Sequence, residues 1–279
     1  MSGNIRWEAV LAAAALVAAP SALPGQNGFS LGRDFDRGGF WVEWLKPSFE
    51  DDEGLTFTTS AVTIGTALRL SRGVSLIAEL PYARAGFEGG GFQESSSSIG
   101  NPYIGLRFEG RGTGFRPLVQ LGVRLPAAPE DDDAAAAQLI GMLTDYDRFE
   151  AFAPKMTTLS LMVGARTAGT SGPFARFLVG PAVMRPDEGD TEVFLGYGVQ
   201  AGVAIQRVTA AAAFTGRAWV TDGDECDDVG DCTIHQLTLS AGYRLGLVEP
   251  VAFVRVPLDE DLGDVLTSVI GLGLSVRLP

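Results

Sequence analysis

The sequence predicts an all-β fold: a single closed antiparallel transmembrane barrel of about twelve strands, with a candidate helix in its third long loop. Three observations support this prediction. Apolar and polar residues alternate along many segments, short and long connections alternate between those segments, and acidic residues gather in the long connections. Alternation with period two is typical of strands, and connections of unequal length at the two ends are typical of bacterial outer-membrane barrels.

The N-terminal segment predicts export from the cytoplasm. Arg6 precedes an apolar run at residues 9–19, which proline residues follow, and this pattern is typical of a signal peptide. The run is too short to span a bilayer as a helix. The alternative is an alanine-rich buried helix. We expect a signal peptide over residues 1–25, a periplasmic segment over 26–37 and the barrel over 38–279.

Twelve segments have the alternation and length that a tilted transmembrane strand requires. They are 38–46, 56–70, 74–85, 99–109, 115–125, 156–168, 173–185, 193–205, 208–221, 234–244, 247–256 and 265–278. No domain boundary is needed between them.

The connections are sorted by length and by charge. Short ones lie near 71–73, 110–114, 169–172, 206–207 and 245–246, and long ones near 47–55, 86–98, 126–155, 186–192, 222–233 and 257–264. The long connections hold 27 of the 34 acidic residues and only two basic ones, whereas the short turns hold three arginines and no acid. A soluble sandwich has no reason to sort charge by end. We therefore expect the long loops outside the cell and both termini in the periplasm.

The two faces of each strand follow from the alternation. Arg116, Gln120 and Arg124 alternate with apolar residues along one strand, and the last strand places Leu266 and Ile270 together on its apolar face. Ten arginines fall on the polar face of the strands: Arg69, Arg107, Arg116, Arg124, Arg166, Arg176, Arg217, Arg244, Arg255 and Arg277. Four acids share that face: Glu43, Glu79, Glu109 and Glu249.

The polar face is expected to line the lumen. A charge on the lipid face at mid-bilayer costs roughly 2–4 kcal/mol, and only Arg84 and Arg185 have lipid-facing parity, each at the outer end of its strand. The ten arginines, with Glu79 and Glu249, are candidates for a solute path. Such arginines would select anionic solutes. The alternative is that they pair with the acids and fill a small barrel.

A short motif resembles one known family. The matching residues are Leu80, Pro81 and Tyr82, then a Gly/Ser-rich stretch, then Gly100, Asn101, Pro102, Gly105 and Leu106. In this stretch of about 35 residues the chain is similar to outer-membrane proteins of the phenol-degradation meta-pathway type. The resemblance implies a barrel and the uptake of apolar or aromatic compounds, and it supplies no catalytic residues.

The loop over residues 126–155 is long for a passive connection. Acids near its start suit a helix N-terminus, and Leu139, Leu143 and Tyr146 share a helical stripe. This loop is a candidate gate that folds over or into the mouth. An external helix is the alternative.

Two further groups of residues are weak candidate sites. Cys226 and Cys232 predict a small disulfide in an exported chain, in preference to a metal or redox pair. The same loop holds five aspartates whose spacing does not fit an EF-hand, so a solvated acidic loop is favoured over a calcium site. They are Asp222, Asp224, Asp227, Asp228 and Asp231.

His235 is the only histidine and has lipid-facing parity near the outer rim. A catalytic histidine of an outer-membrane phospholipase would be followed two residues later by serine, and here that residue is Leu237. We therefore expect an interfacial histidine and no enzyme.

The sequence as a whole predicts a channel or transporter for small solutes, anionic or aromatic, in the bacterial outer membrane. The alternative is a structural or adhesive surface protein whose own side chains close the lumen. The expected partners are outer-membrane lipids, the barrel assembly machinery and a small-molecule solute, without a cofactor. A net charge of −13 argues against nucleic acid as a partner.

Overall fold

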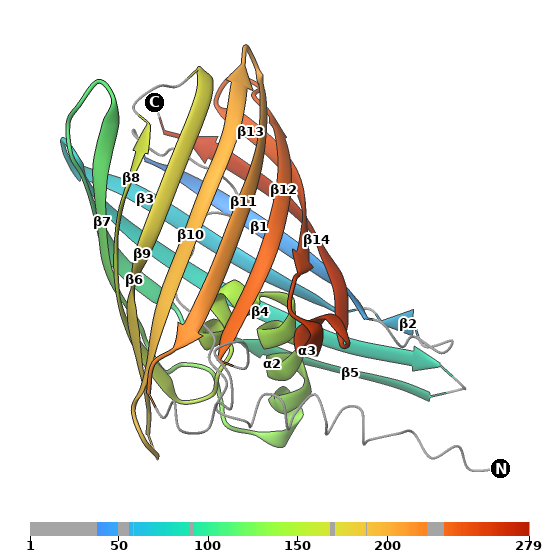
Figure 1. Cartoon of the computed structure of the whole chain (residues 1–279). Helices are drawn as coiled ribbons and strands as arrows, with labels where there is room; N and C mark the ends of the chain where they lie inside the picture. Colours follow the sequence, from blue (N-terminus) through green and yellow to red (C-terminus); the bar gives the residue numbers. More distant parts are fainter. Residues whose placement is uncertain are drawn as a thin grey trace.

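A computed structural model describes residues 38–49, 56–57, 59–89, 92–167, 171–187, 189–221 and 232–278. Fourteen strands occur in these ranges, and twelve of them form a closed ring (Figure 1). The ring consists of β1 (Gly39–Phe49), β3 (Ser60–Ser71), β4 (Val74–Gly89), β6 (Tyr103–Glu109), β7 (Phe115–Arg124), β8 (Met156–Thr167), β9 (Gly172–Pro186), β10 (Glu192–Ile205), β11 (Val208–Trp219), β12 (Thr233–Tyr243), β13 (Val248–Pro257) and β14 (Leu266–Arg277). The predicted fold class is confirmed.

Every strand of the ring pairs antiparallel with its neighbours, and β1 closes the barrel against β14 over almost its whole length. The short turns lie at one end with the chain's C-terminus, and the long connections lie at the other (Figure 1). We name these the periplasmic end and the outer end, after the predicted topology.

The outward face of the ring is an apolar belt. Ile64, Leu80, Leu159 and Ile270 are each about half exposed, although all are large hydrophobic residues in regular strands. Outward exposure of this kind over every side of a closed ring is the surface that lipid covers. Of the helices in the described part of the chain, none is long and apolar enough to cross a membrane.

One predicted loop is wrong. Residues 86–98 were expected to be irregular, but β4 continues to Gly89 and pairs with an additional strand, β5 (Phe92–Ile99). The short β2 (Thr56–Phe57) pairs with the end of β4. Four consecutive serines in β5 hide the strand from a hydrophobic pattern because this hairpin projects beyond the ring, where it needs no apolar face.

The expected strand over 99–109 is also divided. β6 begins only at Tyr103, after a break at Gly100, Asn101 and Pro102. β4 therefore pairs with β5 along its outer half and with β6 along its periplasmic half. Proline lacks the N–H that a ladder needs, which explains why the strand is interrupted here.

The last strand departs from the predicted alternation at its outer end. Ser48 pairs with Ser268, but Phe49 pairs with Leu266, so that Thr267 is skipped in a bulge. A bulge reverses the side-chain parity beyond it. Leu266 is therefore wholly buried inside the barrel, and the prediction that it shares the lipid face with Ile270 is wrong.

Candidate functional site: a lumen with a plugged outer end

Residues 126–155 fold into the outer end of the barrel. The α-helix α2 (Asp132–Thr144) is capped at its N-terminus by Asp131, whose side chain accepts a hydrogen bond from the Ala134 N–H at 2.6 Å. The 3-10 helix η1 (Tyr146–Ala151) follows it. Residues 145–153, which contain η1, are almost all buried, and we name them the plug. The predicted helix is confirmed, and it leads into the mouth instead of lying outside.

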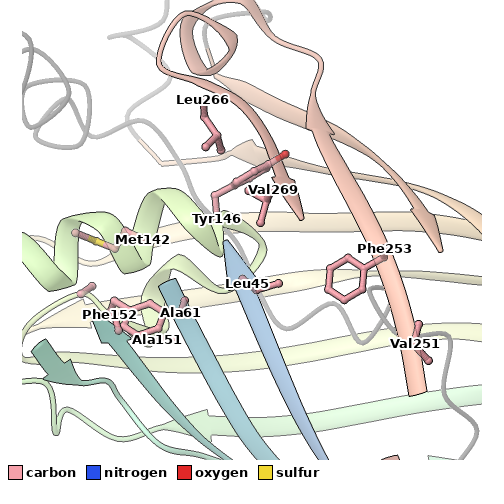
Figure 2. Packing of buried hydrophobic residues seen from close by; sticks show 12 residues of the cluster. Leu45, Ala61, Met142, Tyr146, Ala151, Phe152, Val251, Phe253, Leu266 and Val269 are labelled. Atoms are coloured by element: carbon pink, nitrogen blue, oxygen red, sulfur yellow. The ribbon is translucent and has the colours of Figure 1, made fainter. Parts of the chain in front are cut away.

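Apolar side chains of the plug pack against the barrel wall on different sides. Tyr146 and Phe152 belong to a buried cluster with Leu45 of β1 and Phe253 of β13 (Figure 2). Phe149 packs against a second cluster, which consists of Met184, Phe194, Trp219 and Cys232. The plug thus contacts walls formed by strands from both halves of the chain, and together with these side chains it fills the outer part of the lumen.

Asn101 holds both ends of the loop. Its wholly buried amide Nδ2 donates to the carbonyl oxygens of Glu150 at 2.9 Å and Ala153 at 2.6 Å. Its Oδ1 accepts from the backbone N–H groups of Ala127 and Ala128, each at 2.8 Å. One side chain therefore joins the strand break before β6 to the start and the end of the loop.

The neighbouring glycine lets the plug approach this closely. A Cβ atom on Gly100 would lie 2.1 Å from the Ala151 carbonyl oxygen, well inside contact distance. The Asn101 N–H donates to that same carbonyl at 2.6 Å. The Gly-Asn-Pro motif that carried the family resemblance is thus the point at which the plug is attached to the wall.

Four charged groups form the first part of a buried ionic network. Arg255 of β13 donates to Glu43 of β1 and to Asp145 of the plug, both at 2.9 Å. Arg148 of the plug donates to Glu43 at 3.0 Å and to Asp145 at 2.7 Å. Burial alone would raise the pKa of Asp145, but the two arginines lower it below its usual value. Each carboxylate therefore has two guanidinium partners.

Glu150 forms the second part of the network. It lies 3.2 Å from Arg217 of β11 and 3.5 Å from Arg124 of β7, and Arg124 also donates to Glu79 at 3.1 Å. Both arginines and Glu150 are almost wholly buried. Burial raises the pKa of Glu150, and the two arginines oppose this effect.

The periplasmic half of the lumen has a different charge pattern. Glu109 accepts from Arg116 at 3.2 Å and from Arg166 at 2.6 Å. The ladder pairs Arg116 directly with Arg166, and Arg166 directly with Arg176, on three adjacent strands. Like charges directly opposite each other destabilise a sheet, so this row of three arginines on β7, β8 and β9 is an unfavourable arrangement for folding alone.

The other lumenal residues of this half are also arginine-rich. Arg277 donates to Glu249 at 2.8 Å, and Arg244 lies 3.7 Å from the same carboxylate. Arg107 donates to the Gln120 side chain at 3.2 Å, and Arg69 donates to the carbonyl of Ser71. Side-chain exposure is about 30% for Arg277 and 32% for Arg244, so these groups are more accessible than those of the outer half.

The structure divides the predicted solute-path residues into two groups. Seven of the ten arginines, with Glu109 and Glu249, lie in the periplasmic half and carry a formal charge of +5. Arg124, Arg217 and Arg255, with Glu43 and Glu79, lie in the outer half and are bound to the plug network. These three arginines are buried against plug residues, and their role in a solute path stays a prediction.

Sequence analysis missed the plug residues that complete the network: Asp145, Asp147, Arg148 and Glu150. Alternation can place strand residues inside a barrel, but it says nothing of a loop that folds back into the lumen. One signal was present. Arg148 is the only arginine in any of the long outer loops, and it lies among three acids.

His235 lies on the outward face near the outer rim, as its parity predicted. Its Nε2 lies 2.7 Å from the Tyr197 hydroxyl, and its Nδ1 lies 3.0 Å from an Asp259 carboxylate oxygen. The two rings meet above Gly216, where a Cβ atom would lie 2.6 Å from Tyr197 and 2.8 Å from His235. The expectation that this histidine is not catalytic stays a prediction.

Several predicted features fall outside the described residues. These are the signal peptide, the segment 26–37, Cys226, and the acidic candidates Asp222, Asp224, Asp227, Asp228 and Asp231. The disulfide between Cys226 and Cys232 stays a prediction for the same reason. Among the residues that are described, no cluster of three His, Cys, Asp or Glu side chains could hold a metal ion.

The closed ring, its apolar belt and its polar interior define the architecture of a bacterial outer-membrane β-barrel. Many solved structures resemble the chain, including the following two. The COG4313 outer membrane channel from Pseudomonas putida F1 has a TM-score of 0.61 and 9% sequence identity, and the match covers 91% of this chain and 99% of that one. The translocator domain of the autotransporter NalP from Neisseria meningitidis has a TM-score of 0.52 and 12% identity, with both chains fully covered.

No family model matches the chain, and no curated protein matches its sequence. At identities this low, the two structures establish the fold alone. The prediction of an outer-membrane barrel is confirmed at that level, and the phenol meta-pathway resemblance stays a prediction.

Proposed function

We propose that the chain is an outer-membrane channel or transporter for small anionic solutes, with an anion-attracting lumen at the periplasmic end and a plug at the outer end. The observation that supports this proposal most directly is the row of Arg116, Arg166 and Arg176. One carboxylate, Glu109, is shared by Arg116 and Arg166, so the three guanidinium groups on adjacent strands keep an excess of positive charge that attracts anions.

The charge of the two halves supports the same proposal. The periplasmic half carries a formal charge of +5, whereas the outer half, counted with the plug, holds four arginines and five acids. A positive lumen with low-dielectric walls concentrates anions and repels cations. The likeness to a solved outer-membrane channel agrees with this function, although it establishes only the fold.

The test is the reversal potential of the purified protein in planar bilayers under a salt gradient. We expect the wild type to prefer anions, and we expect the triple variant R116Q/R176Q/R244Q to lose most of that preference. Fixed charges are screened by salt, so the wild-type preference should also fall as ionic strength rises from about 0.1 M to 1 M.

A matched control removes the same charge elsewhere. Arg72, Arg84 and Arg185 are exposed and lie in a turn or on the outward face, so R72Q/R84Q/R185Q should keep the wild-type selectivity. Cation preference in the wild type, or equal selectivity in the two triple variants, would contradict the proposal.

A structural or adhesive role with a permanently closed lumen is the second candidate, because the plug and its network fill the outer end. That role predicts no conductance even after the plug is loosened by N101A. Uptake of aromatic compounds is a further prediction that rests on the motif resemblance alone.

A further inference from the structure

The plug network contains one carboxyl group more than it has guanidinium groups. Glu43, Glu79, Asp145 and Glu150 each lie within 3.5 Å of an arginine nitrogen. Asp147 is the fifth acid. Within the part of the chain that the structure describes it has no ion pair, and its one hydrogen bond comes from the Thr215 hydroxyl at 3.1 Å.

Asp147 is nevertheless almost wholly buried, with 5% of its surface exposed. It lines a small cavity between the plug and the wall, which leaves about 10 Å³ for the centre of a water molecule, enough for one. The other lining residues are Tyr146, Thr215, Gly216, Arg217, Ile234 and Gln236.

Other polar atoms of the cavity wall also lack partners among the described residues. These are the Tyr146 hydroxyl, both side-chain polar atoms of Gln236, and Nε and Nη1 of Arg217. The hydrogen bonding that the described residues provide around Asp147 is therefore incomplete. A carboxyl group held here without an ion pair is favoured in its neutral form.

We propose that Asp147 is a proton-controlled latch of the plug: the plug seals the outer end while this carboxyl is protonated and leaves the lumen as it ionises. The proposal rests on the proposed function, because it concerns the regulation of the same passage. It also explains the charge count, since with a neutral Asp147 the network has four carboxylates for four guanidinium groups.

The groups that face Asp147 determine the direction of the effect. Burial raises its pKa, and the nearby Asp145 raises it further, whereas Arg255 on β13, Arg217 on β11 and the hydrogen bond from Thr215 oppose the rise. In the withdrawn plug the carboxyl meets water and has an ordinary pKa of about 3.9. The contribution of Asp147 to plug closure is therefore complete below its ordinary pKa. This contribution is lost as the pH rises through the raised pKa that Asp147 has in the closed state.

Glu150, whose pKa burial also raises, acts in the same direction as Asp147, and Asp145 acts in the opposite direction. Its pKa is lowered in the closed state, so its contribution to closure is lost only as pH falls through that lowered value. The plug should therefore be closed in mildly acidic solution and open as pH rises. The proton released by Asp147 alone lets the ratio of open to closed channels rise up to about tenfold for each pH unit.

The test is the conductance of the reconstituted wild-type protein between about pH 4 and pH 8, compared with D147N. The asparagine side chain of this variant is neutral at every pH and nearly the same size as aspartate. We expect conductance to rise with pH in the wild type and to rise much less in D147N, where Glu150 remains as the plug carboxyl group with a raised pKa. A D147N channel with the wild-type pH profile, or one that is more open than the wild type, would overturn the latch.

Two further variants define the mechanism. T215V removes the hydrogen bond that favours the ionised carboxylate, so its opening should shift to higher pH. D132N removes an exposed acid at the start of α2 and should keep the wild-type profile. An unshifted midpoint in T215V, or an equal loss of pH dependence in D132N, would also count against the latch.

Hydrogen exchange separates failure of the latch from failure of the proposed function. The wild type and D147N are compared at the same pH, so that the intrinsic exchange rates cancel. We expect faster exchange over residues 145–153 in the wild type at high pH only. If this difference appears without anion selectivity, the latch stands and the proposed function fails. If the exchange of the two proteins is equal in an anion-selective channel, the latch fails.

Discussion

The two halves of the lumen use the same residue type in opposite ways. Arg124, Arg217 and Arg255 in the outer half have almost no exposed surface, and each contacts a carboxylate. Arg244 and Arg277 in the periplasmic half share one carboxylate and are about one third exposed. The difference arises from the loop that enters one half and supplies three acids. Position on a polar strand face therefore does not decide whether an arginine is structural or available to a solute.

The largest effect is expected from removing the attachment of the plug. N101A deletes four side-chain hydrogen bonds and leaves the Glu150 and Ala153 carbonyl oxygens and the Ala128 N–H without these partners, at a total cost of roughly 3 kcal/mol or more. We expect the plug to leave the lumen, and single-channel conductance to increase, while the barrel stays folded.

Heat-modifiable migration on gels checks that the N101A barrel is intact. Q138A is a matched control, because among the described residues the Gln138 side chain makes two hydrogen bonds, which hold α2 instead of the plug. If N101A conducts no better than Q138A, the outer half is not closed by the plug.

The next effect concerns the ionic network itself. R255M leaves Glu43 and Asp145 with Arg148 as their shared partner in a buried site, and breaking a buried pair in this way costs about 3–5 kcal/mol. The loss of unfolding free energy is measured by denaturant unfolding, followed by the near-ultraviolet circular dichroism of the aromatic side chains in the plug. A change below about 1 kcal/mol would mean that water reaches this network.

The smallest effect is expected at the periplasmic end. R277Q removes an ion pair with Glu249 whose arginine is 30% exposed, and such pairs contribute about 1 kcal/mol or less. The same unfolding measurement should show little change, although anion preference should fall slightly. A loss of stability as large as that of R255M would remove the distinction between the two halves.

Strand patterning predicted the barrel well because each strand meets lipid on one side and a polar interior on the other. The errors occur where that condition ends. The β5 hairpin projects beyond the ring, and Leu266 lies past a bulge at the outer end of β14. Hydrophobic periodicity could predict neither feature. The β5 hairpin has no face in contact with lipid, and the bulge in β14 reverses which side chains point outward.

The site could be predicted only in part for a related reason. The alternation located the interior arginines, but the plug partners of Arg124, Arg217 and Arg255 are Asp145 and Glu150, which lie more than twenty residues from each of them in sequence. The motif around Asn101 indicates a family resemblance, but it does not predict the four hydrogen bonds that Asn101 makes. Those bonds depend on the position of residues 127–153 in the folded chain, which the motif does not contain.

The contact between Glu43 and Arg255 also has a consequence for assembly. These residues lie 212 positions apart, on the first strand and the last but one, so their 2.9 Å contact forms only after the two ends of the chain have met. We expect the charges of residues 145–150 to remain hydrated until then. Closing the seam between β1 and β14 should then complete the pairing and the dehydration of the network together, so we expect the plug to dock in the last stage of folding.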